Sequence, residues 1–245
     1  MASKSTLNAK NLEALGTERL AQLLIEISSG DAAAKRKLRL ALAGAEGPRE
    51  AAREITKRLA SIAKARTFVN WQNRKPLVKD LQTQHSAIME QIAPHDPGEA
   101  LALLWRFMGL ATPVFERCDD SSGTVIDIFH QACADLGEVA KATDPVPEAL
   151  ARQVLDALQD NGFGQFDGLI AIIAPALGPD GVAHLKALVE ELGRTPVTAP
   201  PKSEWQAVGW QGRGRTWLHR AGRGGPGALD PARVAGSPAR SAGGA

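Results

Sequence analysis

The densest group of side chains that could carry chemistry is the loop Asp119-Asp120-Ser121-Ser122-Gly123-Thr124. Two carboxylates and two serine hydroxyls beside a helix start could hold a divalent cation through hard oxygen ligands. The same residue types also cap helices, and acids near a helix N-terminus favour its macrodipole. Because neither EF-hand spacing nor an octahedral ligand set is evident, we interpret the loop as a cap formed by Ser121, Ser122 or Thr124.

Cysteine and histidine residues near this loop raise the alternative of a zinc site. His130 and Cys133 share a helix face at i, i+3, Cys118 precedes the loop, and Asp119 or Asp120 would supply a fourth ligand. Zinc sites usually show tighter paired spacing, and Cys133 lies close to an apolar stripe where a free cysteine is an ordinary core residue. We therefore expect no metal and no cofactor, with Asp119, Asp120, His130 and Cys133 as the candidates if one binds.

Recognisable catalytic motifs are missing from the sequence. It contains no phosphate-binding G-x-x-x-x-G-K-[ST] loop, no nucleophile elbow and no H-E-x-x-H pair. His85 lies on an apolar helical stripe, which favours a hydrogen-bonded core histidine. Nothing in the sequence supports catalysis, although a metal-dependent hydrolase using Asp119, Asp120 and His130 remains an alternative.

A basic helix face is the best electrostatic surface in the chain. At about 100° per residue, four cations of the helix that begins at Pro48 fall within roughly an 80° arc, opposite its apolar stripe; they are Arg49, Arg53, Lys57 and Lys64. Trp71 follows this helix and is flanked by Arg74, Lys75 and Lys79. The face could bind nucleic-acid phosphates, could be merely solvated, or could dock on the acidic part of another copy.

Charge is divided sharply along the chain. Residues 1–79 carry 16 Lys and Arg against 7 Asp and Glu, a net charge of +9. Residues 80–201 carry 6 against 18, or −12, and residues 202–245 carry 7 against 2, or +5, so that the whole chain is +2. Such an uneven distribution of charge bears on binding partners and solubility rather than on the fold.

Apolar residues recur at helical spacing over most of the chain, and no period-two pattern typical of strands competes with them. Capping residues, Gly and Pro delimit the segments. The predicted helices cover residues 11–28, a segment capped by Asp31 and ending at Ala43, a segment from Pro48, a segment from Pro76 ended by Pro94, and residues 99–118 (bent at Pro113), 124–141, 147–160, 169–177 and 181–192. The fold class is all-α.

Two helical segments open alike, which indicates a repeat. The Glu-Ala-Leu triplets ending at Leu101 and Leu150 lie 49 residues apart, and an Asp- and Gly-rich loop follows each helix. The repeat predicts equivalent buried positions for Leu101 and Leu150, and likewise for Val125 and Leu169. It also predicts that Asp167 caps the helix at residue 169. If the repeats stack, the acidic residues of the two loops form one edge that a partner could bind: Asp119, Asp120, Asp160 and Asp167.

The chain divides by composition into three parts. Residues 1–195 form the helical-repeat domain, residues 196–208 a Pro-rich linker, and residues 209–245 a disordered tail of mostly Gly, Ala, Arg and Pro. The tail cannot cap a stack, so the last helix exposes an apolar side that invites self-association. Two cysteines, no secretory signal and no long apolar run point to a cytoplasmic protein without a membrane partner.

Three segments carry a resemblance to known proteins: Phe68 to Trp71, Glu116 to Val125, and Asp160 to Leu169. They resemble an uncharacterised bacterial family, the domain of unknown function 6880. The resemblance covers residues 5–208 and implies a helical fold and a C-terminally truncated or frameshifted chain, without any catalytic residue. The Asp-Asp-Ser-x-Gly-x-Val loop is also similar to helical-repeat regions attached to SWIM-type zinc fingers, whose Cys and His ligands are absent here.

These observations together favour a stack of antiparallel helical pairs, similar to HEAT or tetratricopeptide repeats, that binds a protein partner and catalyses nothing. The first alternative is a nucleic-acid-associated protein using Arg49, Arg53, Lys57 and Trp71. The second alternative is the metal-dependent hydrolase described above.

Overall fold

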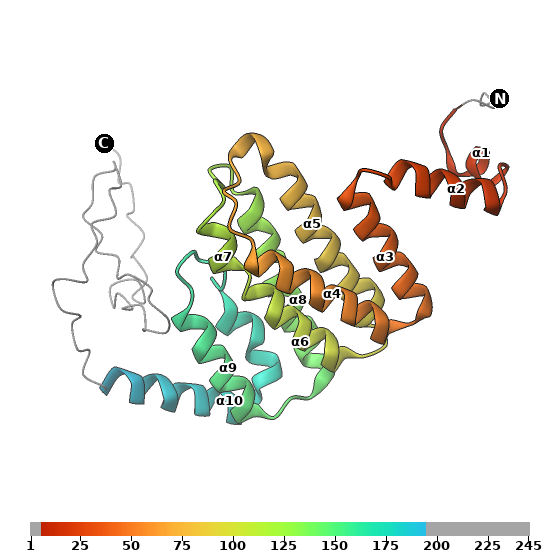
Figure 1. Cartoon of the computed structure of the whole chain (residues 1–245). Helices are drawn as coiled ribbons and strands as arrows, with labels where there is room; N and C mark the ends of the chain where they lie inside the picture. Colours follow the sequence, from red (N-terminus) through yellow and green to blue (C-terminus); the bar gives the residue numbers. More distant parts are fainter. Residues whose placement is uncertain (1–5, 195–245) are drawn as a thin grey trace, which may run out of the picture.

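The computed structural model describes residues 6–194, and every regular element in that range is helical (Figure 1). The predicted all-α class is confirmed, apart from one isolated parallel bridge between Val69 and Cys118. The elements are α1 (Ala9–Glu13), α2 (Thr17–Ser28), α3 (Ala32–Glu46), α4 (Pro48–Lys64), the 3-10 turn η1 (Trp71–Asn73), α5 (Arg74–Ala87), the π-turn η2 (Ile88–Ile92), α6 (Pro97–Met108), α7 (Ala111–Phe115), α8 (Thr124–Thr143), α9 (Pro147–Gln159) and α10 (Leu169–Arg194). The predicted linker 196–208 and tail 209–245 lie outside the described residues.

Helices α1 and α2 form an arm, hereafter the N-terminal arm, that extends away from the other helices (Figure 1). The prediction of one helix over residues 11–28 is wrong, because Gly16 adopts φ 80° and separates α1 from α2. Glycine reaches this left-handed region without steric cost. The apolar face of α2 is not buried either, since Ser28 is its only buried residue. The amphipathic pattern was correct, but within residues 6–194 the neighbouring helices leave most of this face exposed.

Helices α3 and α4 begin as the sequence predicts. The Asp31 carboxylate accepts hydrogen bonds from the backbone N–H groups of Ala33 and Ala34 at 2.8 and 3.1 Å, and these bonds lower the pKa of Asp31. Pro48 occupies the first turn of α4, where its missing N–H costs no helical bond. The buried stripe of α4 then packs against α3, η2 and α6.

The core lies between α4, α5, α6 and α8, with α9 and α10 on the far side of α8 (Figure 1). Phe107 of α6 and Phe129 of α8 are fully buried, and their ring centroids are 5.4 Å apart. Helix α8 packs against α6 on one side and α10 on the other. This central position accounts for the many buried residues along α8, and it fixes where the loop before α8 can lie.

Gly137 permits the close approach of α8 and α10. A Cβ atom at this position would stand 2.8 Å from the backbone oxygen of Ile172 and 2.4 Å from its Cγ2. Real Cβ contacts are longer, so the two helices could not keep this separation with a larger residue.

The long apolar segment predicted over residues 99–118 is two helices rather than one bent helix. Helix α6 ends at Met108, and Gly109 and Leu110 lead into the short α7. Pro113 is the third residue of α7, where a helix has no intrahelical partner for the N–H that proline lacks. The break therefore precedes Pro113 instead of forming at it.

Helix α10 contains a kink where the sequence predicts a gap between two helices. Gly178 has non-helical backbone angles (φ 62°, ψ −177°) between Pro175 and Pro179. Within residues 6–194, α10 alone is long and apolar enough to cross a membrane by length and composition, with 28% of that window buried. Because the kink divides it, neither half reaches the roughly 20 residues that a straight span requires.

The predicted repeat register is only partly matched. Leu150, Val125 and Leu169 are buried, whereas Leu101 is half-buried and its neighbour Ala100 is fully buried instead. The two helix starts also differ, since Asp96 accepts a hydrogen bond from the N–H of Glu99, whereas no side chain caps the start of α9 and Asp144, at φ 45°, is the C-cap of α8. The matching residues of the two segments therefore do not occupy equivalent positions in the structure. The similarity to HEAT or tetratricopeptide stacks stays a prediction.

Candidate functional site

Asp120 provides the main cap of α8, whereas the sequence suggested a hydroxyl group from Ser121, Ser122 or Thr124. The backbone N–H of Val125 donates to both carboxylate oxygens of Asp120, at 3.0 and 2.9 Å, and the N–H of Ile126 donates to Oδ2 at 2.9 Å. The Ser122 hydroxyl lies 2.7 Å from the hydroxyl of Thr124 and accepts a longer hydrogen bond, of 3.4 Å, from the N–H of Thr124, so that the predicted Ser122 cap is present as the weaker contact. A carboxylate accepts these first-turn donors better than a neutral hydroxyl does, because the helix macrodipole favours a negative charge there.

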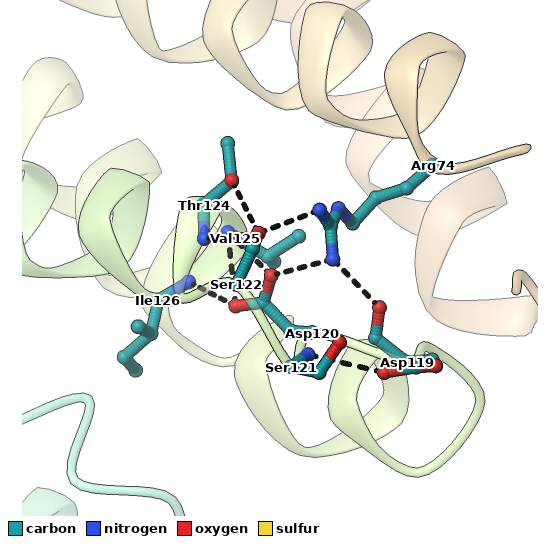
Figure 2. A network of polar contacts seen from close by, with 8 residues as sticks. All are labelled: Arg74, Asp119, Asp120, Ser121, Ser122, Thr124, Val125 and Ile126. Atoms are coloured by element: carbon teal, nitrogen blue, oxygen red, sulfur yellow. Dashed lines mark hydrogen bonds and ion pairs between the residues drawn. The ribbon is translucent and has the colours of Figure 1, made fainter. Parts of the chain in front are cut away.

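Arg74 ties this loop to the start of α5 (Figure 2). Its guanidinium donates to the backbone oxygen of Asp119 at 2.9 Å and to the Ser122 hydroxyl at 2.5 Å, and it lies 3.4 Å from Oδ1 of Asp120. The side chains of Arg74 and Asp120 are only 13% and 7% exposed. We call this set of contacts the Arg74 clasp. It joins the first residue of α5 to the loop that precedes α8.

The geometry leaves little capacity for a cation at this loop. Three amide contacts and the guanidinium occupy the Asp120 carboxylate, and Oδ1 of Asp119 accepts from the N–H of Ser121 at 3.0 Å. Among residues 6–194, no group of three or more His, Cys, Asp and Glu side chains is placed to hold a metal ion. The arrangement therefore fits a structural junction and offers no support for the hydrolase alternative.

The second acidic loop, residues 160–168, is held mainly by its own amide side chains. Asn161 accepts a hydrogen bond from the N–H of Phe166 at 2.7 Å and donates to Asp167 at 2.9 Å. Gln165 is fully buried; its Nε2 donates to the backbone oxygen of Asp160 and its Oε1 accepts from the N–H of Phe163. The expectation that Asp167 caps α10 is wrong, because Asp167 is used inside the loop.

The candidate zinc ligands serve packing and loop contacts. His130 Nε2 lies 3.0 Å from the backbone oxygen of Gly164, which joins α8 to the second loop. Cys133 is buried in the core, and burial raises the pKa of its thiol to about 11, with a smaller contribution from the charge of Asp167. Burial also raises the pKa of Cys118, where Asp120 adds to the shift and Arg74 opposes it. Both thiols are therefore protonated at neutral pH, whereas zinc binds the thiolate.

The four candidate acids of the proposed partner edge are not equally available. Asp160 and Asp167 are exposed, while Asp119 and Asp120 are partly covered by the clasp. The second loop contacts α7, which precedes the first loop, through Phe115 and Phe163, whose ring centroids are 5.0 Å apart. The more exposed carboxylates come from the second loop, and a shared binding edge stays a prediction.

The basic face of α4 and Trp71 lie in different places. Arg53 and Lys57 each lie 2.5 Å from a carboxylate on the same helix, those of Glu50 and Glu54. Arg49, Arg53 and Lys57 line a groove of about 830 Å³ that also holds Asp96 and Glu99. Lys64, the fourth cation of the face, is the last residue of α4, which is about 25 Å long at 1.5 Å per residue, and it does not line this groove. Trp71 lines a different hollow, together with residues of α5.

Several polar contacts, partly or fully buried, join residues that lie far apart in the sequence. The guanidinium of Arg58 pairs with Asp80, and His85 Nε2 lies 2.8 Å from Oδ2 of Asp135. Buried Arg117 reaches the backbone oxygen of Ile62 at 3.4 Å, at the end of α4. These partners stand 22 to 55 residues apart, so no local spacing could have revealed them.

Comparison with known proteins identifies a family without identifying an activity. No curated protein and no solved structure matches the chain. A family of unknown function, DUF6880, matches residues 2–223, in agreement with the resemblance carried by the three sequence segments and extending past its limit at residue 208. The chain belongs to this family of unknown function.

Proposed function

We propose that the protein is a non-catalytic binding module that docks on a partner protein through its N-terminal arm. The observation that carries the proposal is the exposed apolar face of α2. Leu24 and Ile27 are 48% and 70% exposed, and Leu42 of α3 is exposed as well. An isolated amphipathic helix with an uncovered apolar face is marginal in water and is a common mode of partner recognition.

The chemistry of the other conspicuous residues supports binding over catalysis. Asp120 and Arg74 hold the junction before α8, His130 contacts the second loop, and both cysteines are buried. Side chains occupied in this way stabilise the fold and have no free capacity for substrate. The apolar stripe of the arm, by contrast, contains several large aliphatic residues that stay exposed.

The charge around the arm indicates the kind of partner. Helix α3 follows the arm and carries four cations, none of which forms an ion pair shorter than 4 Å within residues 6–194: Lys35, Arg36, Lys37 and Arg39. The partner should therefore present an apolar stripe bordered by carboxylates, since such a surface complements both features. Residues 80–201 of a second copy have the required negative charge, −12.

Exchange of the exposed aliphatic residues tests this function. The full chain and its Leu24→Gln, Ile27→Gln variant should be tagged in the native host, and co-purified proteins quantified by mass spectrometry. The variant should lose its partner while remaining helical by circular dichroism. A matched variant, Val146→Gln with Ile170→Gln, changes two exposed aliphatics outside the arm and should keep the partner.

Sedimentation velocity of the purified chain distinguishes the source of the partner. A dimer that the arm variant abolishes identifies a second copy, whereas a monomer that recovers one protein from the host identifies another chain. The proposal fails if the arm variant and the matched variant recover the same proteins and sediment alike.

A further inference from the structure

A hollow of about 860 Å³ lies where α5 begins, beside the start of α8. Trp71 and Gln72 of η1 form one wall, and Lys75 and Lys79 of α5 form another. Of the described residues that line this hollow, three are cations and none is acidic. This composition differs from the groove along α4, where carboxylates face the cations.

The two lysines of the hollow are available to an anionic ligand. Neither Lys75 nor Lys79 forms an ion pair shorter than 4 Å within residues 6–194, whereas Arg74 is committed to Asp120. The charge of Lys79 contributes to the lowered pKa of Asp31, but that carboxylate already caps α3. Lys75 and Lys79 are one helical turn apart and so project from the same side of α5.

Trp71 adds an aromatic surface to these charges. Its side chain is 63% exposed and lines the hollow, although tryptophan is usually buried to a large extent. An exposed indole beside lysines can stack a planar base while the ammonium groups contact phosphates.

A second hollow, of about 340 Å³, extends the first. The two share Lys79 and Gln82, and the second continues to Lys37 on α3 before it reaches Glu90. Cations therefore follow one another from the tryptophan along α5 toward α3. A track with three separate lysines suits a chain of phosphates better than a single phosphate group.

We propose that this track, which runs from Trp71 past Lys75 and Lys79 to Lys37, binds single-stranded nucleic acid. The strand lies with one base stacked on the indole and successive phosphates beside the lysines. Paired bases cannot reach the indole, because both of their faces are covered in a duplex. The site does not include the apolar face of the arm or the α4 face, although Lys37 is also one of the α3 cations that border the proposed partner surface.

Fluorescence anisotropy with a labelled oligothymidine of about 12 nucleotides tests the site on the full chain. Lys75→Glu with Lys79→Glu should weaken binding at least about tenfold and lower the salt dependence, since each lost phosphate contact removes about one unit of slope. Trp71→Ala should also weaken binding about tenfold, through lost stacking, with an unchanged salt slope. Circular dichroism verifies that each variant keeps its helices.

Charge-matched and ligand-matched controls isolate the track. Arg53→Glu with Lys57→Glu makes the same change in net charge on α4 and should reduce binding less than about threefold. A duplex of the same length and a polyglutamate peptide should bind at least about tenfold more weakly than the single strand. Absence of binding at low salt, equal losses for the two charge variants, or equal affinity for polyglutamate would each overturn the proposal.

Discussion

The two acidic loops look similar in sequence and are held in opposite ways. The loop before α8 relies on an arginine from a distant helix, which bonds to Asp119, Asp120 and Ser122. The loop before α10 relies on Asn161 and Gln165, which bond to the loop itself. The difference shows that composition alone does not reveal whether a polar loop is free to bind a ligand. The loop is free only where its polar groups are not already bonded to other residues of the protein.

The largest expected loss of stability comes from a substitution in the first loop, which precedes α8. Asp120→Ala removes a nearly buried acceptor, leaves Val125 and Ile126 without a cap, and leaves the Arg74 charge without its carboxylate. We expect the free energy of unfolding to fall by about 2 to 4 kcal/mol in urea denaturation.

Asp119→Ala is the matched control for this prediction. It removes the neighbouring carboxylate, which accepts only from the N–H of Ser121, and should cost about 1 kcal/mol or less. Equal losses for the two variants would show that the clasp does not distinguish Asp120 from its neighbour.

A smaller loss is expected in the second loop. Gln165→Ala leaves the N–H of Phe163 and the backbone oxygen of Asp160 without their partner, at a fully buried position. The free energy of unfolding should fall by about 1 to 3 kcal/mol, measured in the same denaturation experiment. Exposed Asp167→Ala should stay within about 1 kcal/mol of the unmodified protein. Should Asp167→Ala prove the more costly, Gln165 is not the main residue that holds this loop.

The smallest effects concern the two cysteines, Cys133 within α8 and Cys118 just before the first loop. The pKa of Cys133 is raised from 9.0 to about 11, so its contribution to stability is present below pH 9 and is lost as the pH rises toward 11. Compared with Cys133→Ala, the unmodified protein should therefore lose stability over this pH range. Cys118, whose shift is opposed by nearby arginines, should also react with a thiol reagent before Cys133. Simultaneous labelling of both thiols would indicate global unfolding instead.

Much of the fold could be predicted because helix signals are local. Asp31, Pro48 and Gly178 act within one helical turn, and the structure begins or interrupts helices at each of them. The burial of α2 could not be predicted, since an amphipathic pattern shows which face is apolar and not whether another helix covers it. The break at Gly109 was missed because the more visible Pro113 fits within the first turn of a helix.

The site was predicted less well, and the reason is distance along the chain. Ser121, Ser122 and Thr124 were recognised as capping candidates, whereas the main cap is Asp120, which is held by Arg74. Sequence spacing assigned Arg74 to the surroundings of Trp71. Likewise, nothing near Gln165 in sequence indicates that its side chain is fully buried. Contacts of this kind arise from how the helices pack, which local patterns do not encode.

The Arg74 clasp also has a consequence for the order in which the protein folds during synthesis. Arg74 bonds to groups 45 and 48 residues further along the chain, whereas Asp120 caps amides only five and six residues away. The cap closes a short loop and can form together with α8, but the clasp must wait until the intervening helices have left the ribosome. The same loop thus takes part first in a local event and later in the long-range docking of α5 on α8.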